Sequence, residues 1–328
     1  MKRFLVVLVC LGAVTSLWAM GAKDPGSTQK LELKMGLVAN ASSLEFKAAT
    51  RFAELVAERT GGSVTVTIYP GSQLGDDRAM LEQVAAGVLD MTFGETGRFG
   101  LWVPYAEIFQ LPFVFDDFEH LVRSTQTDFG KQLQADLLAK GWRLLANGYN
   151  GTRQTSSNRP ISGIADMRGL KLRVPNAKAN MGYAQYTGAS AVPMAFGEVY
   201  LALKTNTVDG QENPLPAINA MKFYEVQKYI AMTGHILNDQ NYVISEKTWA
   251  RLPKDLQAIV AQAAVEAAAY HTQLFKTDEA NLITFFKEQG VTITTPDRAP
   301  FRAAVAPLIQ DYNAKFGDKA VKAIDSAR

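Results

Sequence analysis

The spacing of apolar residues predicts alternating strands and helices in the first third of the chain. Residues 31–39 and 63–69 carry the alternation of a half-buried strand, and 89–93 forms a further short apolar run. Apolar positions near a period of 3.6 predict a helix over 44–59, which ends at a Thr-Gly-Gly stop. A second helix is expected over 76–87, with two aspartates at its start, where the helix dipole favours negative charge. This βαβαβ order predicts an α/β fold with a mostly parallel sheet.

The same order of elements returns in the middle of the chain. Short apolar alternations again lead into segments of helical periodicity, which predicts a second α/β unit. The predicted strands are 142–149, 171–174, 190–194 and the segment from 208 onward, and the predicted helices are 177–187 and 197–204.

The last third of the chain is expected to be helical. Residues 253–290 keep a periodic apolar pattern without an internal proline or glycine, which predicts one unusually long helix. A turn near 276–279 is the alternative, and would split it in two. An unbroken helix of this length is able to pack against both α/β units. Two further helices are predicted from residue 297 to the end.

The stretch GLKLRVPN (169–176) places an arginine close to the end of a predicted strand. Three apolar residues alternate with Lys171 and Arg173, and Pro175 ends the hydrogen-bonded ladder because it has no N–H. Arg173 therefore either lies on the solvated face beside Lys171 or serves a ligand where the chain leaves the sheet. The pattern alone leaves both interpretations open.

The first residues have the composition of a secretory signal peptide. Lys2 and Arg3 precede an apolar run over 4–17, which is shorter than the roughly 20 residues that span a bilayer, and small residues follow it. We expect a signal peptide over 1–22 and export to the periplasm. Cys10 lies inside the apolar run after a valine, which argues against a lipid anchor.

Removal of this segment changes the picture of charge and redox chemistry. Cys10 is the single cysteine, so the mature chain has none and thiol chemistry is excluded. Two of the 34 basic residues leave with the signal, which balances the remainder against 32 acidic residues. No basic block occurs, so neither nucleic acid nor an anionic membrane surface is an expected partner. The remaining length suits two domains.

Sequence signatures of catalysis are absent. There is no G-x-S-x-G, P-loop, G-x-G-x-x-G or H-E-x-x-H motif. The three histidines, His120, His235 and His271, lack metal-ligand spacing, so neither a metal nor a cofactor is expected. His120 and His271 are expected at helix surfaces. A carboxylate pair such as Glu95 and Glu212 leaves glycoside cleavage as an alternative.

Polar residues gather instead at predicted strand ends and loop starts. These are Asp77, Glu95, Arg153, Arg173 and Asn213. In open α/β sheets such positions face the ligand crevice. The planar guanidinium fork matches a carboxylate, and amides and carboxylates suit hydroxyls. We therefore expect an anionic, hydroxylated solute.

Four long motifs carry a family resemblance. They are YPGSQLGDDRAMLEQV, NGTRQTSSNRPISGIADMRGLKLRVPN, PMAFGEVYLALKTNTVDGQENP and FYEVQKYIAMTGHILNDQ. They resemble the periplasmic solute receptors of tripartite ATP-independent periplasmic (TRAP) transporters, and among these the sialic-acid receptors most. The resemblance implies a monomeric receptor, not an enzyme, which delivers its solute to a sodium-driven membrane permease.

The resemblance also implies a domain organisation. Family members have a two-domain periplasmic binding protein-like fold, with crossing strands and one long helix that spans both domains. We expect domain I over 23–150 plus 236–278, and domain II over 151–235 plus 279–328. The family closes over its ligand.

By resemblance, two arginines receive the solute carboxylate. Arg173 matches the arginine that clamps it, Asn213 also holds it, and Arg153 matches a second arginine close by. Glu95 and Asp77 match residues that bind the hydroxyls of a sugar acid. The sialic-acid receptors therefore suggest N-acetylneuraminic acid as the solute.

Four further residues receive roles from the same resemblance. Phe196 would pack on the ligand, and Ala177 matches the small residue beside an N-acetyl group, although both also suit an ordinary core. Glu212 and His235 resemble the partners that hold the clamping arginine without touching the solute.

One departure from the family pattern bears on the ligand. Sialic-acid receptors carry Asn-Ala-Gly after the first strand, and Val38 stands here in place of the asparagine. Asn40 lies two positions further on and points to the same side of an extended strand, so it is a candidate substitute. The alternatives are a hexuronate or another hydroxylated monocarboxylate and, from a different class, a periplasmic sugar-acid hydrolase.

Overall fold

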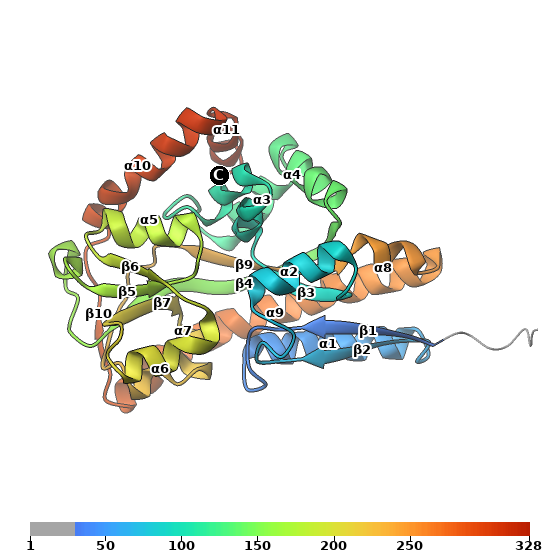
Figure 1. Ribbon diagram of the computed structural model, residues 1–328, viewed down its shortest axis with the longest axis horizontal. Helices are drawn as coiled ribbons and strands as arrows, with labels where there is room; N and C mark the ends of the chain where they lie inside the picture. Colours follow the sequence, from blue (N-terminus) through green and yellow to red (C-terminus); the bar gives the residue numbers. More distant parts are fainter. Residues whose placement is uncertain (1–29) are drawn as a thin grey trace, which may run out of the picture.

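The computed structural model describes residues 30–328 of the chain. The expected signal peptide over 1–22 lies outside the described residues. Strands occupy the middle of the molecule and helices cover them, with α9 (Lys254–Glu288) passing along both halves (Figure 1). The α/β class with a long helix is thus confirmed.

The first predicted βαβαβ series is present. Ser43 caps α1 by accepting a hydrogen bond from Phe46 N, and Asp76 caps α2 in the same way. Gly87 ends α2 in the left-handed conformation that glycine adopts without strain. The elements are β1 (Leu31–Gly36), α1 (Leu44–Arg59), β2 (Val64–Tyr69), α2 (Asp77–Ala86) and β3 (Met91–Gly94), followed by the 3-10 turns η1 (Thr96–Leu101) and η2 (Pro104–Gln110) and by α3 (Phe118–Thr125) and α4 (Asp128–Ala139).

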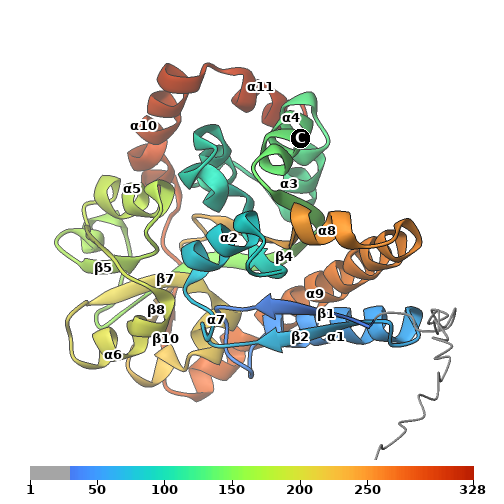
Figure 2. The same ribbon diagram turned by 45° about the vertical axis from the view of Figure 1, so that its right-hand side comes forward.

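The second predicted series is also present, with shorter helices than the first. Its strands lie beside β4 (Trp142–Ser157) and form the other half of the sheet (Figure 2). The elements are η3 (Ile164–Met167), β5 (Lys171–Val174), α5 (Lys178–Tyr186), β6 (Ser190–Pro193), η4 (Phe196–Glu198), α6 (Val199–Lys204), β7 (Gly210–Pro214), α7 (Leu215–Ala220), η5 (Phe223–Glu225) and β8 (Tyr229–Ala231).

The sheet is mixed, which corrects the expectation of a mostly parallel one. Its strand order is β2-β1-β3-β9-β4-β7-β5-β6, and β8 pairs with β4 and with β10 (Thr292–Thr294). The strand β9 (Leu237–Ser245) runs antiparallel to both β3 and β4, and β7 runs antiparallel to β4. The two halves are joined by strands that run in opposite directions, so parallel pairing is confined to the outer strands of each half.

The strand β4 extends eight residues beyond the predicted end at Tyr149. It pairs with β9 as far as Thr152 and then with β7 and β8, so it belongs to both halves. Its register against β9 shifts between Tyr149 and Thr152, around Gly151 at φ +88°. Glu279 of α9 fixes this bulge, accepting hydrogen bonds from the Tyr149 hydroxyl (2.7 Å) and Thr152 N (3.0 Å).

The long helix α9 is unbroken, and no turn occurs near 276–279. Val260 and Ala264 pack in the core of the first half, with β1 and β9, whereas Leu282 and Phe286 pack in the core of the second half. Two separate apolar contacts therefore hold one helix along its length. The ribbon of α9 passes along both halves (Figures 1 and 2). The helices α8 (Glu246–Arg251), α10 (Ala299–Phe316) and α11 (Lys319–Asp325) complete the described chain.

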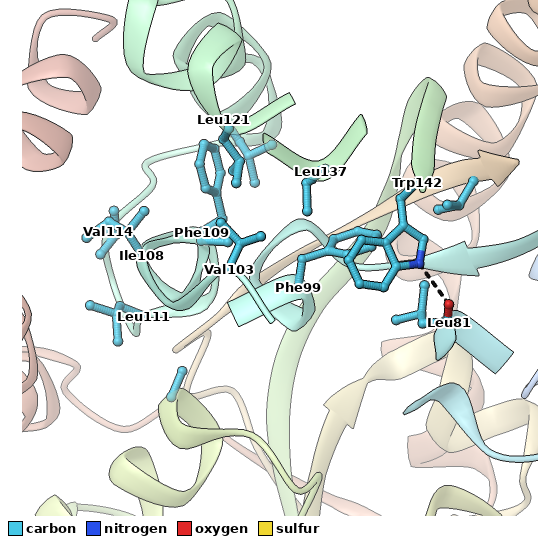
Figure 3. Packing of buried hydrophobic residues seen from close by; sticks show 14 of the residues in the cluster. Leu81, Phe99, Val103, Ile108, Phe109, Leu111, Val114, Leu121, Leu137 and Trp142 are labelled. Carbon is cyan, nitrogen blue, oxygen red and sulfur yellow. Dashed lines mark hydrogen bonds between the residues drawn. The ribbon is translucent and has the colours of Figure 1, made fainter. Parts of the chain in front are cut away.

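An aromatic cluster packs the first half beneath α2 and α4. The indole N–H of Trp142 donates to Leu81 O at 2.8 Å, so its one polar atom is satisfied within the apolar core (Figure 3). Phe99 meets the Trp142 ring edge-on at 5.3 Å. This packing fixes the turn η1 and therefore Glu95 directly before it.

The two histidines expected at helix surfaces are buried. His120 lies in α3, where its Nε2 is 2.8 Å from Ile324 O of α11, and His271 lies in α9 beside β4. Helical periodicity does not reveal that α11 and β4 cover these faces. No helix among residues 30–328 is long and apolar enough to cross a membrane.

Candidate functional site

A cleft of about 410 Å³ lies between the two halves. This volume suits a small solute. Residues from the start of α2, the end of β3, β4, β5, the loop before α6, β7 and β9 line it. Six of the residues proposed from the sequence meet there: Asp77, Glu95, Arg153, Arg173, Phe196 and Asn213.

Arg173 is buried, so the interpretation that it lies on the solvated face is wrong. Its Nε and Nη2 donate to Met194 O at 3.1 and 2.7 Å, and the Phe196 ring lies 5.9 Å from the guanidinium carbon. Nη1 has no hydrogen-bond partner among residues 30–328. Burial lowers the pKa of Arg173 to about 9, which leaves it charged at neutral pH. A buried, charged donor is thus free to bind an anion.

Glu212 binds Arg153 rather than Arg173. Both oxygens of Glu212 accept from Arg153, one from Nε and the other from Nη2 at 2.9 Å, and Asn180 donates to it at 3.1 Å. Burial opposes ionisation of Glu212, but Arg153 and a hydrogen bond from His235 outweigh burial and hold its pKa at about 2. The resemblance implied support of the clamping Arg173, and the contacts instead hold its neighbour.

His235 completes this buried set. Its Nε2 lies 3.2 Å from Glu212, its Nδ1 lies 2.9 Å from the Thr233 hydroxyl, and its ring stacks on Tyr183 at 3.7 Å. Burial lowers the pKa of His235 although Glu212 opposes this shift. In the neutral ring, Nε2–H donates to Glu212 and Nδ1 accepts from Thr233. Neither Glu212 nor His235 lines the cleft.

Carboxylates of the first half also line the cleft. Glu95 accepts hydrogen bonds from Gln110 and, at 3.0 Å, from Asn238. Burial raises the pKa of Glu95 to about 7, although the Arg153 charge 4.0 Å away opposes the rise. Asp77 accepts a hydrogen bond from Arg98 Nε. These oxygens can accept from solute hydroxyls.

Two residues proposed from the sequence do not line the cleft. Ala177 is buried at the start of α5. Asn40 donates to Ala220 O at 2.9 Å and accepts from Ser42, while Val38 lines the cleft. The side chain of Asn40 is thus engaged outside the site, and the structure does not support its substitution for the missing asparagine.

Several cleft residues were missed from the sequence. Arg98 carries a buried Nη1 without a partner in the described chain, and Asn238 and Gln240 carry buried side-chain oxygens in the same state. Asn150 lines the cleft from β4. For Asn238 and Gln240 the available signal was the run of three polar residues in LNDQ, which belongs to the unpredicted strand β9. Among residues 30–328, no group of three or more potential metal ligands occurs.

Comparison with known proteins identifies the family. The profile of the family "bacterial extracellular solute-binding protein, family 7" (DctP) matches residues 35–315. The chain belongs to this family. The sialic acid-binding periplasmic protein SiaP of Vibrio cholerae is 49% identical to the receptor over 94% of its chain and 95% of that protein. The 2,3-diketo-L-gulonate-binding periplasmic protein YiaO of Escherichia coli is 32% identical over 94% and 96%.

Solved structures share the receptor's fold. The sugar acid binding protein DctPAm of Advenella mimigardefordensis, in complex with galactonate, has a TM-score of 0.87 at 30% identity and covers 91% of this chain and 98% of its own. A TRAP periplasmic solute binding protein of Roseobacter denitrificans with bound β-D-glucuronate has a TM-score of 0.86 at 32% identity, covering 90% and 100%. The protein is therefore a TRAP solute-binding receptor and not an enzyme, which excludes the hydrolase alternative.

Proposed function

We propose that this receptor captures a sugar acid in the periplasm, with N-acetylneuraminic acid as the first candidate. The observation that carries the proposal is Arg173 Nη1, a buried donor without a partner in the described chain, in a cleft shared with Arg153 and Asn213. A carboxylate would satisfy this donor and neutralise the charge. The 49% identity to a sialic acid-binding protein supports the choice of solute.

The cleft walls suggest which solute groups lie where. Arg173, Asn213 and Arg153 would hold the carboxylate, and Glu95 and Asp77 would accept from hydroxyls on the other side. Phe196 would pack on the ligand. The resemblance places Ala177 beside an N-acetyl group, and this role stays a prediction. Ala177 does not line the cleft, so the cleft geometry gives this role no support.

A hexuronate or another hydroxylated monocarboxylate is the second candidate. Val38 in the cleft wall, where sialic-acid receptors carry an asparagine, favours it. Similar receptors also hold such acids: those cited above bind galactonate and β-D-glucuronate.

Calorimetry with a panel of acids tests the proposal. The panel contains N-acetylneuraminic acid, D-glucuronate, D-galacturonate and D-galactonate, with N-acetylmannosamine as a sugar without a carboxylate. We expect micromolar or tighter binding of at least one acid and none of the neutral sugar. The ranking distinguishes the two candidates, and absence of binding by every acid would contradict a sugar-acid receptor.

We further propose that two domains close over the solute. They are domain I over 23–150 plus 236–278 and domain II over 151–235 plus 279–328. The hydrogen bond from Asn40 to Ala220 O runs between the two proposed domains. The solute would favour the closed form because only there does it reach both walls.

Small-angle scattering tests closure. Saturating solute should reduce the radius of gyration of the receptor, and an equal radius with and without solute would contradict closure.

We also propose that the receptor, exported as a monomer by its signal peptide, presents the loaded form to a sodium-driven TRAP permease. Uptake by membrane vesicles that contain the permease would require the receptor and a sodium gradient.

A further inference from the structure

A buried histidine of α9 contacts one residue of the cleft. The ring of His271 lies among Phe93, Tyr242 and Phe275, at centroid distances of 5.7, 6.4 and 4.7 Å. Its Nε2 lies 3.1 Å from Oδ1 of Asn150, which lines the cleft. Because aromatic rings surround the imidazole, it cannot swing away from Asn150.

A glycine in β4 makes this contact possible. A Cβ at Gly148 would lie 3.1 Å from Ala268 O and 3.3 Å from the His271 Cβ. The strand therefore approaches the helix backbone more closely than a larger residue would allow. At this distance His271 reaches Asn150 two positions along the strand.

The second ring nitrogen decides the direction of the hydrogen bond. Nδ1 of His271 is buried without a partner among the described residues. If Nε2 carries the hydrogen, it donates to Asn150 Oδ1 and Nδ1 keeps only an unused lone pair. The other tautomer would bury an unpaired N–H, the rarer defect in folded proteins. Burial lowers the pKa of His271 to about 3, so the ring is neutral at neutral pH.

The side-chain NH₂ group of Asn150 is consequently available as a hydrogen-bond donor in the cleft. His271 occupies the carbonyl oxygen, and Nδ2 has no hydrogen-bond partner within residues 30–328. Asn150 and Arg153 belong to the same strand, β4, and both line the cleft together with Arg173. An N–H in this position matches a solute oxygen.

We infer that Asn150 donates a hydrogen bond to an oxygen of the bound sugar acid, and that His271 is the positioning residue that presents it as a donor. The inference rests on the proposed function and adds to it a contact that selects for an acceptor atom. A solute that carries only a methyl or methylene group at this place would bind more weakly, because the N–H would stay unpaired.

Calorimetry on Asn150 variants tests the contact, with N-acetylneuraminic acid and D-galactonate as ligands. Asn150→Ala should weaken binding of the better ligand by about tenfold, as expected for a hydrogen bond to a polar or charged group. Asn150→Asp should weaken it further, because a carboxylate accepts but does not donate and repels the anion. Asn158→Ala, at the exposed position directly after the same strand, is the control. Unchanged affinity of both Asn150 variants would overturn the inference.

The role of His271 is tested by non-additivity. His271→Leu should weaken binding several-fold in the wild-type background and add nothing in Asn150→Ala, whereas a purely structural defect would weaken both equally. His271→Gln keeps an N–H donor and should recover most of the affinity. Urea unfolding confirms that each variant is folded. If the wild type binds neither these two acids nor any other of the panel, the proposed function itself fails, a result distinct from wild-type affinity in the variants.

Discussion

Glu212 binds Arg153 through both of its carboxylate oxygens, while the neighbouring Arg173 donates only to the backbone carbonyl of Met194. The two cleft arginines therefore differ in kind. Arg153 has its charge balanced within the protein, whereas the charge of Arg173 has no direct counter-ion in the described chain. An anionic solute gains most from Arg173.

Glu212→Gln should destabilise the fold more than it weakens binding. Removal of the Glu212 charge leaves the buried Arg153 without its directly hydrogen-bonded counter-ion, which costs about 3–5 kcal/mol. Urea unfolding measures the loss, and Glu288→Gln, at an exposed position of α9, is the control. Solute affinity should fall less than in Arg173→Ala. A ligand-bound structure with Glu212 in contact with the solute would contradict this supporting role.

Arg173→Ala should weaken binding of the best acid at least tenfold, since loss of one partner of a buried charge pair costs about 2–5 kcal/mol. Arg173→Lys should also bind poorly because an ammonium group does not reproduce the planar fork. Lys171→Ala, on the exposed face of the same strand, should bind like the wild type. Calorimetry decides, and wild-type affinity in Arg173→Ala would rule out the clamp.

The stability of the empty receptor should fall with rising pH through the titration of Glu95. Burial raises its folded pKa from 4.5 to about 7, so between these values the folded protein holds a proton that the unfolded chain has released. The contribution is present below pH 4.5 and lost as the pH rises through 7, and amounts to about 3 kcal/mol at most.

Glu95→Gln should remove this dependence. Comparison of unfolding free energies between pH 4.5 and 7.5 should show the wild type losing stability relative to the variant. A constant difference across this range would mean that Glu95 titrates normally.

Gly151→Ala, at the bulge of β4, should lower the free energy of unfolding. Its φ of +88° disfavours a side chain, and a Cβ would also press on Pro214 and lie 2.9 Å from Glu279 Oε1. Gly169→Ala shares a positive φ of +72° but meets nothing within 4 Å, so it isolates the backbone cost of about 1–2 kcal/mol. Thermal unfolding should rank Gly151→Ala as the less stable variant, and equal stabilities would contradict the steric argument.

Local periodicity predicted most outer elements of the fold. The bounds of α1 were correct and those of α2 were within one residue, because Ser43 caps the start of α1 and Asp76 and Gly87 cap the two ends of α2. The strand β9 and the second half of β4 were missed. Their cleft-facing residues are polar, so the apolar alternation that marks a strand is absent where the sheet borders the site.

The sequence placed six residues correctly in the cleft wall but not their partners. Strand ends predict which side chains face a crevice, so Arg173 and Asn213 were found. Pairing of Glu212 with Arg153 depends on the register of β7 against β4, which places Glu212 opposite Thr155. A register of this kind is set by tertiary contacts and has no local signal.

The burial of Arg173 in the cleft wall has a thermodynamic consequence. Its guanidinium is already removed from water when the protein folds, so that cost reduces the stability of the empty receptor and not the affinity for the solute. Replacement by methionine, an apolar side chain without a charge to desolvate, should therefore raise the melting temperature while abolishing capture. The buried, unpaired charge of Arg173 thus lowers the free energy of unfolding of the protein, and binding of the solute carboxylate restores this stability. Part of the binding affinity therefore comes from relief of this destabilisation.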